Sequence, residues 1–399
     1  MSILGRWSLA KKVAICVGTL VLVVCVVGYL AFARYLASED TQAVKWDFST
    51  DLATALQSGL DAELTANPGR NAAALYVIAP GLDLDAGFVT GFADPEAKEP
   101  MTLQHDVRVA SVTKSYVAAA AFALEEQGAL SLQTSVRDSV SPELVALIEA
   151  DGYDVDKITL FHLISHRSGI PDYASHLLYQ AQIVGYDLWG HGPEWTVRSQ
   201  LEFVLKHEDP LFEPGTEYAY SDTGYILLGD AIENATGQDL ASAVRAAIGF
   251  EALGLTETWW EVFEAPAGAH PRARQFVGGF DASDVDASID LFGGGGLVAT
   301  QRDVAHGMRA IVTGSMFGEP QTKMRMRVPT ERHYGAGLYR MHFTPETCFG
   351  HGGFWGLLVA HCPEHDITVA LTYTQANAGG QGYTLNEILK GLVARQEAQ

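Results

Sequence analysis

The sequence has 399 residues, with 26 Lys and Arg against 48 Asp and Glu, which gives a formal net charge of −22 at pH 7. A chain this acidic lacks the basic face with which nucleic-acid-binding proteins neutralise phosphates, so we expect no nucleic-acid partner. Hydrophobic residues make up 48% and charged residues 19%, a composition that buries a large core and excludes a disordered chain.

The N-terminal residues have the pattern of a membrane segment. Val13–Ala33 is an uncharged, mainly aliphatic run of 21 residues. As a helix it is about 32 Å long, enough to span a hydrocarbon core of about 30 Å. Basic residues precede the run, so by the positive-inside rule the N-terminus stays in the cytoplasm and the rest of the chain is exported to the periplasmic (extracytoplasmic) side. Ala31-Phe32-Ala33 also has the small residues of a cleavage site, which leaves a permanent anchor and a cleaved signal peptide as alternatives.

The rest of the chain shows helical segments between two strand-rich ends. We expect these elements in chain order: a helix over Phe48–Leu64 capped by Ser49 or Thr50, strands at Ala73–Ile78 and Gly87–Phe92, an Ala-rich helix over Ala110–Leu130, mostly helical segments from about 140 to 285, strands at Gly335–Phe343, Phe349–Cys362 and Ile367–Thr374, and a final helix from about Leu385.

This order predicts an α/β fold in which an antiparallel sheet, built from both ends of the chain and covered by helices, receives an inserted helical region. We divide the chain into a cytoplasmic tip and anchor (1–40) and one globular domain (41–399). Within this domain, 41–110 and 290–399 form the α/β part and 111–289 the mainly helical part. Functional groups are expected where the two parts meet.

Ser111-Val112-Thr113-Lys114 opens the Ala-rich helix and combines a hydroxyl with an amine. A Ser and a Lys three residues apart lie on one face of a helix, within reach of each other. The hydroxyl is a poor nucleophile at neutral pH and needs a base, which a partly buried Lys amine can provide. A helix N-terminus also favours the negative charge that develops during acyl transfer. A capping Ser with a solvated Lys gives the same pattern, so the motif needs support from elsewhere in the sequence.

Two later segments supply this support. Tyr220-Ser221-Asp222 lies between a loop rich in turn residues and a hydrophobic helix, and it presents two polar side chains two residues apart. Gly350-His351-Gly352-Gly353 lies in a strand-forming segment, where glycines allow a substrate to lie close against the strand edge.

In this order the three segments resemble those of the serine penicillin-recognising enzymes, specifically the branch with class C β-lactamases, D-alanyl-D-alanine carboxypeptidases and related esterases. That family has Ser-x-x-Lys, then Tyr-x-Asn or a variant, then Lys-Thr-Gly or His-x-Gly. The resemblance extends to Val107–Lys114, Leu163–Tyr173 and Gly294–Thr300, and it covers roughly residues 48–395. It implies a β-lactamase/transpeptidase-like fold and a serine hydrolase that needs neither a cofactor nor a metal.

The resemblance also implies a role for each matched residue. Ser111 attacks the substrate carbonyl and forms the acyl-enzyme, and Lys114 takes its proton. Tyr220 passes a proton to the leaving group and later activates the hydrolytic water. The backbone N–H groups of Ser111 and of Phe354, the residue after Gly353, form the oxyanion hole.

Two positions depart from the family's pattern. Asp222 stands where the family often has Asn, and an ionised carboxylate cannot donate a hydrogen bond to a substrate carbonyl. It can instead pair with Lys114 and keep the amine charged. His351 stands in place of Lys; it is implied to help bind the substrate carboxylate and to tune Tyr220, with a charge that depends on pH near about 6–7. These departures favour peptidase or ester hydrolysis over class C β-lactamase activity, and a non-catalytic binding or sensing module on the same fold remains an alternative.

The remaining expectations concern cysteines, acids and partners. Cys348 and Cys362 flank a candidate hairpin and form either a disulfide or two buried thiols. Trp355 either lines the acyl pocket or packs in the core, and selectivity is expected in the loop Ala174–Trp195. One acidic stretch lacks the glycine and terminal Glu of a calcium loop and predicts a solvated loop: Asp281, Asp284, Asp286 and Asp290. The expected partners are a small-molecule or peptide substrate and, through the N-terminal helix, the membrane; no protein partner is implied.

Overall fold

The computed structural model describes residues 41–399 except 191, 268–270, 331–332 and 377. The predicted membrane segment Val13–Ala33 therefore lies outside the described residues. Within the described part of the chain, no helix combines the length and the apolar character needed to cross a bilayer.

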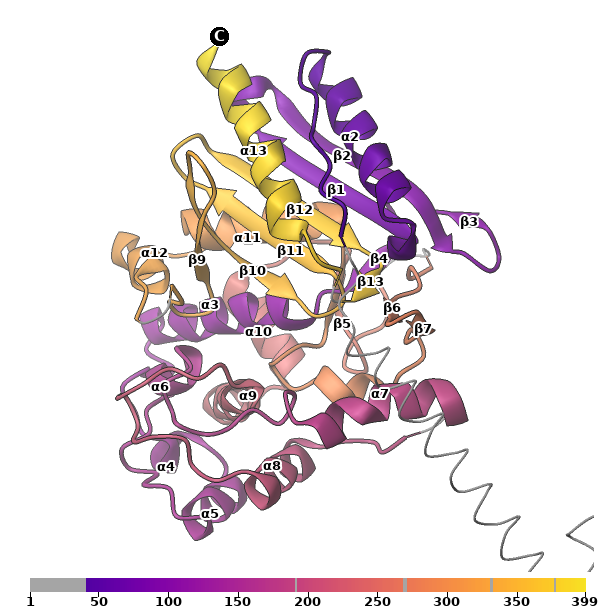
Figure 1. The fold of residues 1–399 in the computed structure, drawn as a ribbon. Helices are drawn as coiled ribbons and strands as arrows, with labels where there is room; N and C mark the ends of the chain where they lie inside the picture. Colours follow the sequence, from indigo (N-terminus) through magenta and orange to yellow (C-terminus); the bar gives the residue numbers. More distant parts are fainter. Residues whose placement is uncertain (1–40, 191, 268–270, 331–332, 377) are drawn as a thin grey trace, which may run out of the picture.

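The largest sheet is built from both ends of the chain. Its strands are β1 (Ala72–Ala79), β2 (Leu84–Asp94), β3 (Glu99–Pro100), β9 (Tyr339–His342), β10 (Thr347–Gly353), β11 (Leu357–Cys362) and β12 (Ile367–Tyr373). Among the described residues these seven strands form an antiparallel sheet in the order β3-β2-β1-β12-β11-β10-β9. The two ends meet where β1 pairs with β12, with Leu75 opposite Leu371 (Figure 1). The predicted antiparallel sheet is confirmed.

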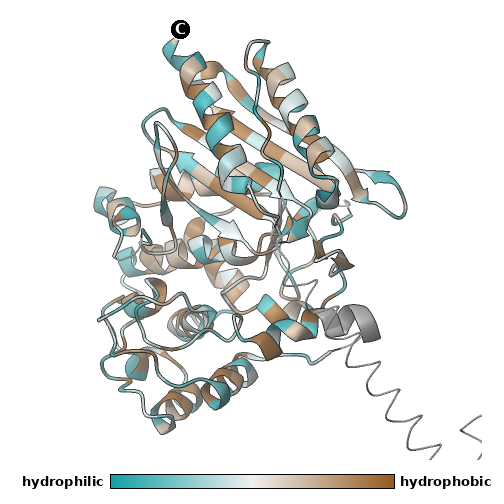
Figure 2. Ribbon diagram, in the orientation of Figure 1, coloured by the Kyte–Doolittle hydropathy of each residue, from teal (hydrophilic) through white to brown (hydrophobic). Residues whose placement is uncertain are grey.

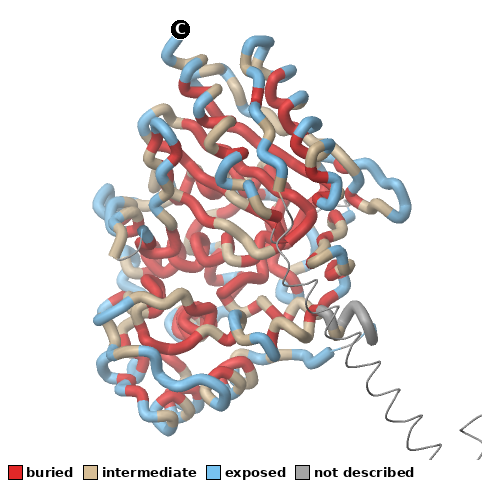
Figure 3. Tube along the Cα trace, in the orientation of Figure 1, coloured by how far each residue is buried: buried red, intermediate tan, exposed pale blue. Residues whose placement is uncertain are grey.

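Alternation along β1 explains why both faces of this sheet are covered. Leu75 and Val77 belong to a core that includes the apolar sides of the first and last helices, whereas Tyr76 and Ile78 belong to a second core shared with the helical region. Side chains alternate across a strand, so one strand serves two cores. Accordingly, hydrophobic residues follow the strands in Figure 2, and the buried part of the chain in Figure 3 runs through the sheet into the helices below it.

The helices cover the sheet and form a second region beside it. They are α2 (Leu52–Ala66), α3 (Thr113–Glu126), α4 (Val136–Ser139), α5 (Pro142–Ala150), α6 (Leu160–Ile164), α7 (Leu177–Trp189), α8 (Val197–His207), α9 (Asp222–Thr236), α10 (Leu240–Ile248), α11 (Gln301–Thr313), α12 (Pro320–Arg327) and α13 (Gln381–Glu397). Helices α2 and α13 lie on one face of the sheet, and α11 packs on the other with α12 beside it (Figure 1). Helix α3 runs between the sheet and the helical region that contains α4, α5, α6, α8 and α9.

Two small sheets join the regions. Their strands are β4 (Asp106–Arg108), β5 (Thr258–Trp260), β6 (Phe276–Val277), β7 (Phe280–Asp281), β8 (Leu297–Thr300) and β13 (Gln375–Ala376). They pair in the orders β4-β8-β5 and β13-β6-β7. Strands β5 to β7 lie within the segment 111–289, which is nevertheless mainly helical; its exact boundaries remain a prediction.

Several boundaries differ from those expected. The helix expected over Ala110–Leu130 is shorter, Thr113–Glu126, and the strand expected over Gly335–Phe343 is Tyr339–His342. Helix α2 is capped by Asp51, not by Ser49 or Thr50, because the Asp51 carboxylate accepts a hydrogen bond from Thr54 N at 3.0 Å. The expected strand Phe349–Cys362 is two strands, β10 and β11, joined by a turn with Gly356 at φ 96°. The final helix begins at Gln381, four residues before the expected start, after Gly380.

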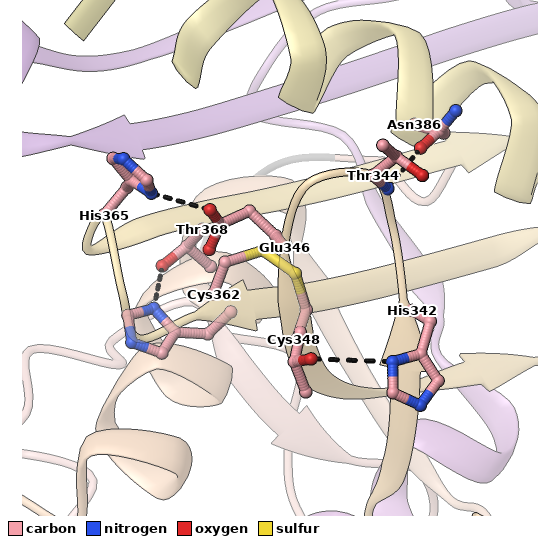
Figure 4. Close-up of a disulfide and its surroundings, with 10 residues drawn as sticks. His342, Thr344, Glu346, Cys348, Cys362, His365, Thr368 and Asn386 are labelled. Atoms are coloured by element: carbon pink, nitrogen blue, oxygen red, sulfur yellow. Dashed lines mark hydrogen bonds and ion pairs between the residues drawn. A yellow bond between two sulfur atoms is a disulfide. The ribbon is translucent and has the colours of Figure 1, made fainter. Parts of the chain in front are cut away.

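Cys348 on β10 and Cys362 on β11 form a disulfide, with 4.1 Å between their Cα atoms (Figure 4). Cys348 precedes Phe349 and Cys362 follows His361, and these two neighbours form the last pair of the ladder between β10 and β11. The register of the two strands therefore places the cysteines opposite each other. Of the two alternatives from the sequence, the structure has the disulfide.

Candidate active site

Ser111 lies in a tight turn between β4 and α3. Residues Ala110–Val112 form a 3₁₀ turn, and the α-helix begins only at Thr113, so Ser111 precedes the helix instead of opening it. Ala110 has φ 47°, a left-handed conformation that is unfavourable for a residue with a Cβ. Such strain is concentrated at functional sites, where the surrounding structure holds it in place.

Lys114 is fully buried and contacts the Ser111 hydroxyl. Its Nζ donates a hydrogen bond to Ser111 Oγ at 2.9 Å and another to the Gly294 carbonyl oxygen at 2.6 Å. The same nitrogen lies 2.5 Å from Asp222 Oδ1 in an ion pair. The buried ammonium group thus has two hydrogen-bond acceptors and one carboxylate as counter-charge. The alternative of a solvated Lys is therefore wrong, and the pairing with Asp222 is confirmed.

The start of α9 positions Tyr220 and Asp222. Ser221 is the N-cap of this helix, and its backbone N–H donates to Nδ1 of the buried His166 at 3.1 Å. The backbone N–H of Asp222 donates to Asp172 Oδ1 at 3.0 Å. These bonds attach the segment to Leu163–Tyr173, which explains why both segments belong to one site.

The Tyr220 ring lies against the lysine. Its centroid is 5.2 Å from Lys114 Nζ, within the range of a cation–π contact. Burial and the neighbouring Asp222 raise the pKa of Tyr220 well above its ordinary value, so the phenol is protonated in the free site.

The end of β10 lies beside Ser111. A Cβ on Gly353 would come within 2.3 Å of the Val109 carbonyl oxygen, so this approach of β10 to the turn requires glycine. The next residue, Phe354, lines the same pocket as Ser111. The arrangement brings the two residues of the expected oxyanion hole together; the direction of their N–H groups remains a prediction.

His351 lies on β10, and its expected part in binding the substrate carboxylate and tuning Tyr220 stays a prediction. Its ring is buried, and Nδ1 donates to the Gly352 carbonyl oxygen at 2.7 Å. In the neutral ring Nε2 is then an acceptor, and it lies 3.3 Å from the Tyr334 hydroxyl. Burial and the nearby Lys114 lower the pKa of His351 to about 3, so it is uncharged near neutral pH. The predicted charge change near pH 6–7 is therefore wrong.

Ser111 opens onto a pocket of about 230 Å³. Tyr220 and Asp222 contribute one side of it, Phe354 and Trp355 another, and α7 a third. The residues from this third side come from the segment in which selectivity was expected, and most of them lie on the helix instead of in a loop: Ala174, Ser175, Tyr179, Gln180 and Ile183. Trp355 lines the pocket, as one of its two alternatives predicted.

Two acids in this pocket, Asp172 and Asp290, were not predicted as site residues from the sequence. Burial and the charge of Asp222 raise the pKa of Asp172 to about 7 and that of Asp290 to about 8. Asp290 was assigned to a solvated acidic loop, and this is wrong: its Oδ1 is buried and a Cβ on Gly295 would come within 2.1 Å of its Oδ2. Among the described residues, no group of three or more His, Cys, Asp or Glu is arranged to hold a metal ion.

Comparisons with known proteins identify the family of this chain. The family model described as Beta-lactamase matches residues 59–391. Penicillin-binding protein 4* from Bacillus subtilis is 29% identical over 170 residues, which are 42% of this chain and 33% of that protein. Esterase EstB from Burkholderia gladioli is 35% identical over 171 residues, 42% of this chain and 41% of that protein. The alignments thus span only a third to two fifths of these two relatives.

A similar fold is found in the D-amino acid amidase from Ochrobactrum anthropi SV3 complexed with L-phenylalanine amide. Its TM-score is 0.73 at 23% identity, over 87% of this chain and 100% of that one. The fold is therefore that of the β-lactamase/transpeptidase-like α/β proteins. Because the family model spans most of the sequence, the chain belongs to the beta-lactamase family. Family and relatives together indicate a serine hydrolase that acts through an acyl-enzyme.

Proposed function

We propose that the protein is a membrane-anchored, exported serine hydrolase that forms an acyl-enzyme on Ser111 and cleaves a small ester, amide or peptide. The hydrogen bond of 2.9 Å between Lys114 Nζ and Ser111 Oγ, at the wall of a pocket, is the observation that carries this proposal. It joins a nucleophile to a base at the wall of a pocket that a substrate can enter.

The reaction begins when Ser111 Oγ attacks the substrate carbonyl and its proton passes to Lys114 in the amine form. The resulting ammonium is stabilised by Asp222 and the Gly294 carbonyl oxygen, which already surround it. Backbone N–H groups of Ser111 and Phe354 would hold the oxyanion. Tyr220, protonated in the free site, donates its proton to the leaving group. Water then attacks the acyl-enzyme with the resulting tyrosinate as base, and Lys114 returns its proton to Ser111 Oγ as the acyl bond breaks.

The charge of the pocket favours esters and amides over substrates with a carboxylate. None of the described residues that line the pocket is Lys, Arg or His, whereas Asp172, Asp222 and Asp290 all line it. A D-alanyl-D-alanine peptide ends in a carboxylate that would meet these acids. The esterase among the relatives is therefore a better guide to substrate chemistry than the penicillin-binding protein.

Anchoring and export rest on Val13–Ala33, an uncharged run preceded by basic residues. They predict that the full chain stays in the membrane fraction after alkaline carbonate extraction, whereas a chain without residues 1–40 does not. Recovery of the intact full chain in the soluble fraction would overturn the anchor.

The catalytic proposal is tested by labelling with a fluorophosphonate, followed by mass spectrometry of the labelled peptide. The adduct should lie on Ser111 and be absent from Ser111→Ala, while Ser315→Ala, which changes an exposed serine, keeps it. A turnover panel then compares a short-chain nitrophenyl ester, a chromogenic cephalosporin and a D-Ala-D-Ala peptide, of which we expect the ester to be cleaved fastest. Full hydrolysis of any of these by Ser111→Ala would refute the mechanism.

A further inference from the structure

The pocket beside Ser111 collects three carboxyl groups from distant parts of the chain. Asp172 follows α6, Asp222 begins α9, and Asp290 precedes β8, yet all three line one pocket. Asp222 and Asp290 approach each other closely, because a single point, the place of a Cβ on Gly294, lies 3.3 Å from Asp222 Cγ and 3.4 Å from Asp290 Oδ1.

The cations nearby do not neutralise all three acids. Lys114 pairs with Asp222 at 2.5 Å. Arg108, whose charge also acts on Asp290, is already bound to Glu261 through Nε at 2.7 Å and Nη2 at 3.1 Å. Within the part of the chain that the structure describes, neither Asp172 nor Asp290 forms an ion pair, and Asp290 Oδ1 is buried without a hydrogen-bond partner.

Asp290 is held in this position by the glycine-rich segment before β8. A side chain on Gly295 would meet the carboxylate, with 2.1 Å to Oδ2, so the close packing of Asp290 against this backbone depends on the absence of a Cβ. The placement of an uncompensated acid is thus part of the local fold and does not arise from a freely rotating surface side chain.

Aromatic side chains on the other walls of the pocket would also favour a cation. The rings of Tyr179, Tyr220 and Trp355 line the same pocket. Aromatic faces attract ammonium groups, and the attraction grows when water is excluded. The raised pKa values of Asp172 and Asp290 show that negative charge is unfavourable in the empty pocket, and a bound cation would relieve this cost.

We infer that the pocket binds an ammonium group of the substrate through Asp172 and Asp290, so that the protein acts on esters or amides of amino compounds. This inference rests on the proposed function for the reaction itself, and it adds the substrate class. The carboxyl groups attract a cationic substrate and repel an anionic one, such as a peptide with a free C-terminus.

Calorimetric titration of the Ser111→Ala variant tests the inference without turnover. Phenylalaninamide carries the ammonium group, and 3-phenylpropanamide has a hydrogen in its place with the same ring and amide. We expect the cationic ligand to bind at least about tenfold more tightly, the ratio typical of one charge interaction in a partly buried site. Equal affinities, tighter binding of the neutral ligand, or no binding of phenylalaninamide in the millimolar range would each overturn the inference.

Variants of Ser111→Ala then assign the effect to the pocket acids. Adding Asp290→Asn should reduce the preference for phenylalaninamide to about threefold or less, with the affinity for 3-phenylpropanamide unchanged. Asp284→Asn, which changes an exposed acid in the same segment, is the matched control and should keep the full preference. A preference unaffected by Asp290→Asn and by Asp172→Asn would also overturn the assignment. Because binding is measured without the nucleophile, these outcomes are independent of whether Ser111 takes a fluorophosphonate.

Discussion

Lys114 Nζ lies 2.5 Å from Asp222 Oδ1 inside the protein, where the lysine side chain is 0% and the aspartate side chain 8% exposed. A buried ion pair of this kind contributes little by itself, because both charges lose their hydration. Removal of one partner is different, since it leaves the other charge buried and uncompensated. A substitution at either residue should therefore change both the stability of the protein and the proton transfer from Ser111.

Replacement of Lys114 by Met should separate these two effects. We expect Lys114→Met to lose stability by about 3–5 kcal/mol, because Asp222 remains buried without its cation. The double variant Lys114→Met/Asp222→Asn should recover most of this loss but none of the ester hydrolysis, since the base is absent from both. Urea unfolding and nitrophenyl ester turnover measure the two quantities. Equal stability of Lys114→Met and the wild type would show that the ion pair is not formed in solution.

Asp222→Asn alone should slow ester hydrolysis while leaving the nucleophile in place. The carboxylate stabilises the ammonium that Lys114 forms when it takes the Ser111 proton, and a neutral amide cannot replace this charge. We expect kcat/KM for a nitrophenyl ester to fall at least about tenfold. Asp284→Asn serves as the control and should keep the wild-type rate. An unchanged rate in Asp222→Asn would mean that the ion pair does not take part in the proton transfer.

The disulfide is expected to contribute to stability and not to catalysis. Cys348 and Cys362 join neighbouring strands and close a short loop, which in the chain-entropy account contributes about 3 kcal/mol. A Cys348→Ala/Cys362→Ala variant should therefore unfold at a lower temperature and lose its response to reductant, while keeping its fluorophosphonate adduct. If a reductant lowered the unfolding temperature of this variant as well, the effect would not come from this bond.

Local sequence patterns predicted part of the fold and of the site, whereas features that depend on tertiary contacts were not predicted. The sheet and the contact between Ser111 and Lys114 followed from strand alternation and helical spacing, which act over a few residues. The neutral state of His351 did not, because it depends on burial and on Tyr334, which lies in another segment. The role of Asp290 was missed for the same reason: its burial depends on the fold of Gly294 and Gly295 against it, and no spacing rule contains that contact.

The raised pKa of Asp290 also implies that the free energy of unfolding depends on pH. Burial and the charge of Asp222 raise its pKa from an ordinary value of 3.8 to about 8; Asp172 acts in the same direction, whereas Lys114 and Arg108 oppose the shift. Between these values the folded protein holds a proton that the unfolded chain has released. The free energy of unfolding must therefore fall as pH rises through this window, and the stabilisation is lost above about pH 8.

Asp290→Asn removes this titration and should reduce the decline. Measured by urea unfolding of the ligand-free protein, the variant should be more stable than the wild type at pH 9 by about 1–3 kcal/mol, because no charge is then forced into the pocket. At pH 6 the folded wild type still holds the Asp290 proton, so neither folded protein has this charge in the pocket and their difference in stability should be smaller. Asp284→Asn should follow the wild-type curve throughout. If wild type and Asp290→Asn declined in parallel from pH 6 to pH 9, Asp290 would already be ionised near neutral pH, and the attraction that we assign to it would have to be shared with a counter-charge inside the protein.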